Sequence, residues 1–559
     1  MKVYEAVASA LVAEGIDAFF GVMGDGNMSL WAAVGAQGKI PIYDARNEAG
    51  AVAMADGYFR ATGRPSVAAV TCGPGLTQTG TSLVAAVRNK SPVVVLIGEV
   101  PLGEKNSNQT MDQRRFAEAC NARYYSVSKV DNLAEEVAEA FFSARMGRGP
   151  VVLGLPMDLQ EKELDWDFDY RPSSAFLPPR QEDAQDSVIE ILLEKLINAE
   201  RPVLIAGRGA RLAGAKADLV ELGDLTGALL ATSLQGKAFF ADQPFDIGIA
   251  GTYASAPGEE LFSEADFVLG VGAEIGYYTS EGGLLFPSAE VARIDIAPPP
   301  QQIGVIPGLH VQGDARKTVR RLNEKLKQRG VKKVGFRTPQ TRAIMEREQE
   351  PIPRGNDGMD PRLLMKEVSK ALPRDVLITC GVGHFLGFAA VNLAVSEAAE
   401  VLFSLQFGAI GQTLPVAFGI GLGNPGRKHL VIEGDGSLMM NLQELDSVAR
   451  HKVPMVLLIW NDQGFGAEVH KLRVKGFDPS LAQMKTPDFV AIARAVGGDG
   501  AVVREESLIG AAIEQGFAAG GLFVIDARVS PSTISDAYLK IHFGEPNRAP
   551  HLRYENARG

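Results

Sequence analysis

The chain has 559 residues, and at about 100–200 residues per domain this length predicts about three domains. Its net charge of −11 and the absence of a basic run argue against a nucleic-acid partner. No apolar run reaches the roughly 20 residues that cross a bilayer, and three cysteines without CxxC or CxxH spacing argue against a disulfide framework or a zinc site. The charged start "MKVYEAVASALVAEGIDAFFGV" lacks a signal-peptide core, so a cytoplasmic protein without a membrane partner is expected.

Short apolar runs alternate with helical patterns along the whole chain. The runs are "SVAAVT" (66–71), "PVVVLIG" (92–98), "RPVLIAG" (201–207), "ADFVLGVG" (265–272), "DVLITCG" (375–381), "HLVIEG" (429–434), "PMVLLIW" (454–460) and "LFVIDA" (522–527). Continuous apolar strands separated by helices indicate parallel sheets that are covered on both faces. The predicted class is α/β, with three doubly wound parallel-sheet domains.

Two segments interrupt this alternation and are predicted to be linkers. Residues 167–183 are rich in Pro, and residues 337–361 are polar and close with Pro and Gly. The domains expected from these breaks are 1–165, 185–335 and 360–540, followed by a C-terminal tail at 541–559. The irregular sequence that begins at Ser530 is compatible with a lid, a partner-contact arm or a frayed end.

Two carboxylates follow neighbouring apolar runs in the third block. "HLVIEGDGSLMM" predicts a strand, a tight turn through Gly434 and Gly436, and a helix start whose N–H groups suit a phosphate. Asp435 then lies at the carboxyl end of one strand, and Asp462 follows the next strand at the same edge. Two carboxylates and a loop carbonyl would hold Mg²⁺, with a diphosphate and water completing the octahedron. The alternative is a turn glycine with an aspartate helix cap.

The spacing of these residues resembles the diphosphate motif of thiamine-diphosphate enzymes. There, GDG is followed by about two dozen residues and an Asn-Asn pair, and here 24 residues separate Gly436 from Asn461. The resemblance implies thiamine diphosphate and Mg²⁺ as cofactors, with Asp435, the side chain of Asp462 and the backbone carbonyl of Gly464 as metal ligands. Asp462 departs from the usual Asn and adds a negative charge beside an anionic cofactor.

The N-terminal block supplies an independent resemblance. "PIYDARNEAGAVAMADGYFRATGRP" (41–65) is similar to the pyrimidine-binding domain of the superfamily of acetohydroxyacid synthase, pyruvate oxidase and benzaldehyde lyase. The resemblance implies that Glu48 contacts N1′ of the aminopyrimidine. A carboxyl shielded from water holds its proton more readily and can share it with that nitrogen, which activates the thiazolium. The alternative for Glu48 is a surface charge at a helix start.

The other implied cofactor contacts lie in glycine-rich loops. The loops are "GVMGDGN" (21–27), "TCGPGLTQ" (71–78), "ITCGVGHFLGFAA" (378–390), "QFGAIGQTLPVAFG" (406–419), the turn after residue 433 and "NDQGFG" (461–466). The cofactor-binding set that the resemblance implies is Gly24, Gly26, Glu48, Pro74, Gln78, Gly383, His384, Gly408, Ile410, Gly434, Asp435, Gly436, Ser437, Asp462, Gly464, Phe465 and Gly466. Ile410 would wedge the cofactor into a bent shape or serve in the core, and His384 could equally be a structural histidine.

The central block looks like the Rossmann-like domain that relatives use for FAD or ADP or leave empty. The arginine-rich segment expected for a flavin reads "IGYYTSEGG" (275–283) here, so FAD is not expected.

The reaction depends on what quenches the carbanion that the cofactor stabilises. The implied catalytic residues are Glu48, Gln109, Glu468 and His470, although the last two would fit a solvated helix face as well. The leading hypothesis is an acetolactate synthase-like carboligase or lyase acting on a 2-oxo acid or 2-hydroxy ketone. The alternatives are a 2-oxo acid decarboxylase that releases an aldehyde and a cofactor-binding but inactive regulatory subunit. The resemblance also implies a homodimer or homotetramer in which Glu48 of one chain meets Asp435 of another.

Overall fold

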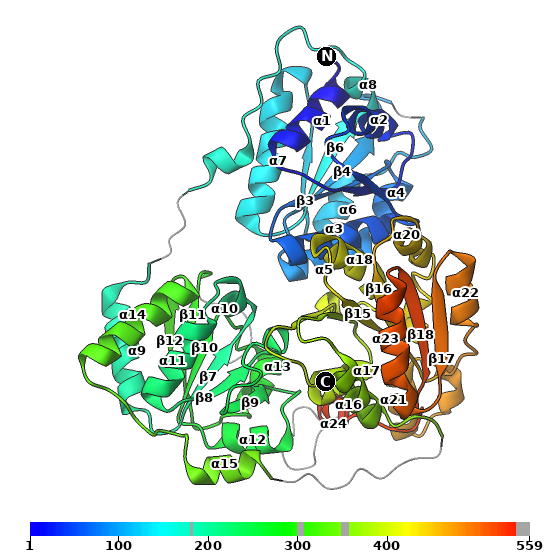
Figure 1. Cartoon of the computed structure of the whole chain (residues 1–559). Coiled ribbons are helices and arrows are strands. Elements are labelled where there is room, and N and C mark those ends of the chain that lie inside the picture. Colours follow the sequence, from blue (N-terminus) through cyan, green and yellow to red (C-terminus); the bar gives the residue numbers. More distant parts are fainter. Residues whose placement is uncertain (105, 179–182, 299–306, 348–356, 544–559) are drawn as a thin grey trace.

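The computed structural model describes residues 1–104, 106–178, 183–298, 307–347 and 357–543 (Figure 1). These residues form three six-stranded sheets, and every strand pair in them is parallel. All eight apolar runs of the sequence form strands, so the predicted α/β class with three parallel-sheet domains is confirmed. Within the described residues, no helix has the length and apolar character that crossing a membrane requires.

The first sheet has the strand order β2-β1-β3-β4-β6-β5. Its strands are β1 (Phe19–Gly21), β2 (Ile42–Asp44), β3 (Ser66–Val70), β4 (Val93–Glu99), β5 (Arg123–Ser126) and β6 (Val151–Pro156). The helices of this domain are α1 (Val3–Ala13), α2 (Met28–Gln37), α3 (Glu48–Thr62), α4 (Pro74–Gln78), α5 (Gly80–Asn89), α6 (Gln113–Ala119), α7 (Leu133–Gly147) and α8 (Met157–Gln160).

The central sheet has the order β12-β11-β10-β7-β8-β9, which is the arrangement of a Rossmann-type domain. Its strands are β7 (Pro202–Ala206), β8 (Leu229–Thr232), β9 (Asp246–Ile249), β10 (Phe267–Val271), β11 (Glu290–Asp295) and β12 (Leu309–Gln312). Its helices are α9 (Asp186–Asn198), α10 (Arg208–Leu212), α11 (Lys216–Thr226), α12 (Ala256–Ser263), α13 (Tyr277–Ser280), α14 (Ala315–Gln328) and α15 (Pro339–Met345).

The third sheet, β14-β13-β15-β16-β18-β17, repeats the strand order of the first. Its strands are β13 (Leu377–Cys380), β14 (Glu400–Phe403), β15 (His429–Gly434), β16 (Met455–Asn461), β17 (Asp499–Val503) and β18 (Leu522–Arg528). Its helices are α16 (Pro361–Ala371), α17 (Phe385–Asn392), α18 (Thr413–Gly423), α19 (Asp435–Leu438), α20 (Glu444–Arg450), α21 (Gly466–Val474), α22 (Phe489–Ala495), α23 (Ile509–Ala519) and α24 (Asp536–Phe543).

The first and third domains are joined by helices α3 and α18, which lie side by side (Figure 1). Glycines allow the two backbones to touch. A Cβ at Gly57 would lie 2.0 Å from the carbonyl oxygen of Val416, and a Cβ at Gly419 would lie 2.0 Å from that of Met54. A larger residue at either glycine would therefore push the domains apart.

The second linker and the tail contain more regular structure than the sequence predicts. Helix α15 forms inside the segment 337–361 because Thr338 caps it by accepting from the Thr341 N–H and because Ile344 is buried in the central core. Helix α24 forms in the sequence after Ser530, whereas the tail beyond Phe543 lies outside the described residues. The domain boundaries themselves stay predictions.

Candidate functional site

Asp435 is the first residue of α19 and directly follows β15, at the carboxyl end of the third sheet. It is 1% exposed. Its Oδ1 accepts from the backbone N–H of Gly436 at 2.8 Å, and its Oδ2 accepts from that of Gly464 at 3.2 Å. The second bond ties the turn after β15 to the loop after β16, so Asp435 and Gly464 are neighbours although they are far apart in sequence.

Asp462 approaches Asp435 from the adjacent strand. β15 and β16 are paired in parallel, with Gly434 opposite Trp460, so both carboxylates leave the sheet at one edge. A Cβ at Gly466 would lie 2.1 Å from Oδ2 of Asp462, which shows that the carboxylate lies against this loop. Burial raises the pKa of Asp435 well above its ordinary value, and burial together with the charge of Asp435 does the same to the pKa of Asp462.

These residues fit a hard divalent cation. Asp435 is buried and Asp462 is half-buried. Two carboxylates that are shielded from water and repel one another gain most from a positive ion between them, and their oxygens are the donors that Mg²⁺ prefers. In the described part of the chain, no cluster of three or more His, Cys, Asp or Glu side chains could hold a metal ion. A cation at this edge would therefore depend on Asp435, Asp462, the Gly464 carbonyl and oxygens of a bound ligand. Gly436 lets the Phe465 ring pack against this turn, because a Cβ there would lie 2.9 Å from the ring.

The loop before α18 is fastened to the same turn. The Gly411 N–H donates to Oγ of Ser437 at 2.8 Å, and the side-chain amide of Asn441 donates to the Gly411 carbonyl. Gly408 is exposed and Ile410 is half-buried. The structure thus ties this loop to Ser437 through Gly411, the residue after Ile410.

In the first domain, Glu48 is the first residue of α3 and is half-buried. The preceding residue, Asn47, caps the helix by accepting from the Ala49 N–H at 2.9 Å. The loop that holds Gly24 and Gly26 packs on Thr71 at the end of β3, where the Gly26 N–H donates to Oγ1 of Thr71 at 3.1 Å. A Cβ at Gly24 would lie 2.7 Å from Cβ of Thr71.

Gln109 lies beside the predicted pyrimidine loop. Its Oε1 accepts from the Cys72 thiol at 2.8 Å, and its carbonyl oxygen would lie 2.7 Å from a Cβ at Gly73, where φ is +58°. Cys72 and Gln109 line a cavity of about 400 Å³ together with Glu99, Gln113 and Tyr124. Pro74 and Gln78, on the short helix that follows, are exposed. No pattern in the sequence predicts the contact between Cys72 and Gln109.

His384 and His470 face each other beneath α24. Their ring centroids are 4.4 Å apart, and Nε2 of His384 accepts from the Ser535 N–H at 3.0 Å. Burial lowers the pKa of His384 to about 3 and that of His470 to about 4, so both rings are neutral at pH 7. The hydroxyl of Tyr538 donates to the Ala467 carbonyl at 2.8 Å and holds the tail on α21.

The two predicted residues of α21 differ in exposure. His470 is 4% exposed and therefore does not lie on a solvated helix face, whereas Glu468 is exposed and lies 3.6 Å from Nζ of Lys471. Gly383 precedes His384 at the start of α17.

Two buried carboxylates near this edge were missed in the sequence. Glu433, the last side chain of β15 before the turn, is fully buried, and burial raises its pKa to about 7. Glu444 is also fully buried and reaches from α20 to the start of α3. The sequence around Glu433 predicts only a strand, and the sequence around Glu444 predicts only a helix start. Neither pattern indicates a buried carboxylate.

Comparisons with known proteins point to one enzyme family. Three family models match: the thiamine pyrophosphate enzyme N-terminal TPP binding domain over residues 1–119, the central domain over 189–322 and the C-terminal TPP binding domain over 381–527. The chain is 28% identical over 536 residues to the acetolactate synthase isozyme 2 large subunit of Escherichia coli, with 94% of each chain covered. It is 27% identical over 514 residues to a probable acetolactate synthase large subunit of Methanocaldococcus jannaschii, covering 89% of this chain and 86% of that one. It is also 28% identical over 535 residues to a probable 2-ketoarginine decarboxylase of Pseudomonas aeruginosa, covering 94% and 93%.

Proposed function

Because the chain belongs to the thiamine pyrophosphate enzymes and resembles the acetolactate synthases, we propose that it is a Mg²⁺-dependent carboligase or lyase. It would form or break a C–C bond next to the carbonyl of a 2-oxo acid or a 2-hydroxy ketone. When bound, thiamine diphosphate supplies a nucleophilic carbon and accepts the negative charge that is left when the adjacent bond breaks.

The convergence of Asp435 and Asp462 is the observation that carries this proposal. Both carboxylates are held at one sheet edge by backbone geometry. Burial raises the pKa of both, and the charge of Asp435 raises that of Asp462 further. A magnesium ion and a diphosphate would balance these charges. The N–H groups of α19 and the loop through Gly464 and Phe465 would cradle the phosphates.

Glu48 would hold a proton at the aminopyrimidine end of the cofactor. Its place at the start of a capped helix fixes its backbone, and partial burial limits access of water to the carboxylate. Gln109 would face the substrate, since it lies beside the loop through Cys72 and Gly73.

We propose a homodimer or homotetramer with shared active sites. Large apolar side chains are exposed near both predicted halves of the site: Met23 and Leu102 in the first domain are 53% and 57% exposed, and Phe407 and Met440 in the third are 55% and 51% exposed. Exposed apolar side chains that cluster at a binding site favour burial against a partner protein. A second copy of the chain would bury them and would bring its own half of the active site to the half described here. Light scattering of the purified protein tests the assembly, and a monomer that is fully active would contradict it.

A 2-oxo acid decarboxylase is the second candidate. Glu468 is exposed on the first turn of α21, directly after the loop that holds Asp462, and could deliver a proton that releases an aldehyde. The similarity to a probable 2-ketoarginine decarboxylase supports this candidate as well.

Two measurements test the proposal. Calorimetry should detect thiamine diphosphate binding in the presence of Mg²⁺ and its loss in excess chelator, and no binding with metal present would refute the proposed cofactor use. Incubation of the loaded enzyme with a panel of 2-oxo acids, followed by mass spectrometry, separates the reactions. A hydroxyketone product supports the carboligase, and an aldehyde alone supports the decarboxylase.

Absence of C2–H exchange in the bound cofactor would instead indicate an inactive regulatory subunit.

The proposal includes no FAD in the central domain. Flavin absorption bands in the spectrum of the purified protein would contradict this part of the proposal.

A further inference from the structure

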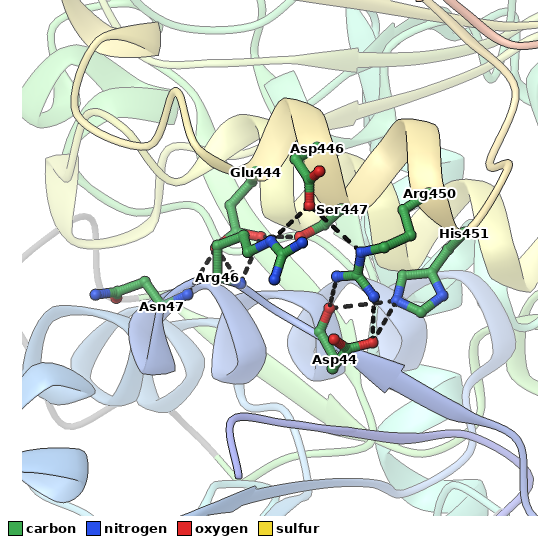
Figure 2. Close-up of polar contacts among 8 residues, drawn as sticks. All are labelled: Asp44, Arg46, Asn47, Glu444, Asp446, Ser447, Arg450 and His451. Carbon is green, nitrogen blue, oxygen red and sulfur yellow. Dashed lines mark hydrogen bonds and ion pairs between the residues drawn. The ribbon is translucent and has the colours of Figure 1, made fainter. Parts of the chain in front are cut away.

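Glu444 links the third domain to the first residues of α3. It is the first residue of α20 and is fully buried. Its Oε1 accepts from the backbone N–H of Asn47 at 3.0 Å and from that of Arg46 at 3.2 Å, and its Oε2 accepts from the hydroxyl of Ser447 at 2.6 Å (Figure 2). One carboxylate thus binds the two residues that directly precede Glu48.

The carboxylate also packs against the first turn of α3. A Cβ at Gly50 would lie 2.5 Å from Oε1 of Glu444, so only glycine leaves room for this approach. A buried carboxylate is costly unless it is hydrogen-bonded, and here the backbone of residues 46 and 47 supplies the donors. The contact therefore fixes both the distance and the angle at which α3 begins.

The surrounding ion pairs cannot replace this contact. Arg46 pairs with Asp446 at 2.5 Å, and Arg450 and His451 reach Asp44 (Figure 2). The side chains of Arg46 and Asp446 are 44% and 33% exposed. Ion pairs with this exposure are worth at most about 1 kcal/mol, because water and salt screen them.

We propose that Glu444 is a positioning residue for Glu48, acting through the backbone of Arg46 and Asn47. The inference rests on the proposed function, in which Glu48 activates the cofactor. Without the Glu444 carboxylate, the N–H groups of residues 46 and 47 lose their acceptor, and the start of α3 shifts toward the space that is left. Glu48 then moves away from the ring nitrogen that it serves, while Asp435 and the diphosphate end stay in place.

The experiment measures the rate of C2–H/D exchange in thiamine diphosphate bound at saturation, together with its dissociation constant. Glu444→Ala is expected to slow exchange at least about tenfold, because displacement of a catalytic group by about 1 Å has effects of this size or larger. Its dissociation constant should stay within about threefold of wild type, since the diphosphate loops are untouched. Glu444→Gln keeps an acceptor oxygen at the same reach and should restore exchange to within about threefold of wild type.

Two further variants separate positioning from general damage. Gly50→Ala pushes on the same carboxylate from the other side and should also slow exchange; it decides the question if Glu444→Ala does not fold. Asp446→Asn removes the exposed ion pairs of the same helix and should leave exchange within about twofold of wild type.

Wild-type exchange in the folded Glu444→Ala or Gly50→Ala variant would overturn the inference, and so would an equal loss in Asp446→Asn. Failure of the wild-type protein to bind thiamine diphosphate would instead refute the proposed function.

Discussion

The first and third domains share one strand order but differ in the residues that follow the third strand of each sheet, at its carboxyl edge. After β15 and β16 the third domain places the carboxylates of Asp435, which is buried, and Asp462, which is half-buried. After the corresponding strand β3, the first domain places Thr71, Cys72 and Gly73, which carry no charge. If the proposed function is right, one strand order serves a cation and a diphosphate at one edge and a neutral ring at the other, as expected when function lies in the site and not in the fold.

The largest expected effect is the loss of turnover when Glu48, the proposed acid of the first domain, is replaced. Glu48→Gln keeps the size of the side chain but cannot hold a shared proton, so turnover should fall by about 10²–10⁴. Thiamine diphosphate affinity, measured by calorimetry, should change little, because in the proposed function the third domain holds the diphosphate end. Unchanged turnover would contradict the role of Glu48.

The next effect tests the acidic edge of the third domain. Asp435→Asn removes one charge from the proposed metal site, and thiamine diphosphate affinity in Mg²⁺ should fall about 100-fold, or about 2.7 kcal/mol. Thermal unfolding of the cofactor-free variant should occur at an equal or higher temperature, since one of two carboxylates that repel each other is gone. The surface variant Asp499→Asn is the matched control and should bind the cofactor normally. Equal affinity in Asp435→Asn and wild type would show that this edge holds no metal.

The strands, and the meeting of Asp435 with the loop after β16, were predictable from the sequence. Continuous apolar runs indicate strands that are buried on both faces of the sheet. Neighbouring parallel strands bring their carboxyl ends together, however far apart these ends are in the sequence. That logic needs no tertiary detail beyond strand adjacency.

The contacts of Glu444 and His470 were not predictable. Glu444 is buried only because the start of α3 packs on α20, and His470 is buried only because α24 covers α21. Both depend on how separate elements dock, which a local pattern does not encode. Helix α15 was missed for the same reason, since Ile344 gains its burial from the central core.

A smaller difference between the two domains concerns the first residue of the equivalent strands β3 and β15. Both are buried and hydrogen-bonded: the Ser66 hydroxyl donates to the Ala55 carbonyl at 2.7 Å, and Nε2 of His429 lies 2.8 Å from Oγ1 of Thr379. Burial lowers the pKa of His429 to about 3, with the charge of Arg427 adding to the effect. Only the third domain therefore carries a titrating group at this position.

This difference predicts acid sensitivity of the third domain. The unfolded chain binds a proton on this histidine below pH ~6.5 whereas the folded chain does not, so stability is fully present above pH 6.5 and falls as the pH drops toward 3. At pH 5 the loss is about 2 kcal/mol. His384 and His470 act in the same direction as His429, and the raised pKa values of Glu433 and Asp435 act in the opposite direction. The contribution of His429 is therefore measured as a difference between two proteins: between pH 7.5 and 5, after correction for intrinsic rates, β15 should lose about 2 kcal/mol more protection from hydrogen exchange in wild type than in His429→Gln. An equal change in the two proteins would assign the pH dependence to other groups.

The smallest expected effect concerns the glycine of the acidic turn. A Cβ at Gly436 would lie 2.9 Å from the ring of Phe465 and 3.4 Å from the Gly464 carbonyl oxygen. The ring is the far end of a side chain and can turn aside, so Gly436→Ala should leave the fold intact. The displaced ring narrows the cradle at the third-domain edge, and thiamine diphosphate affinity should fall about tenfold, or about 1.4 kcal/mol. Gly521→Ala is the control, because a Cβ there meets nothing within 4 Å. Equal thiamine diphosphate affinity in Gly436→Ala and Gly521→Ala would place the diphosphate away from this turn. The negative charges of Asp435 and Asp462 would then have to be balanced by another ligand.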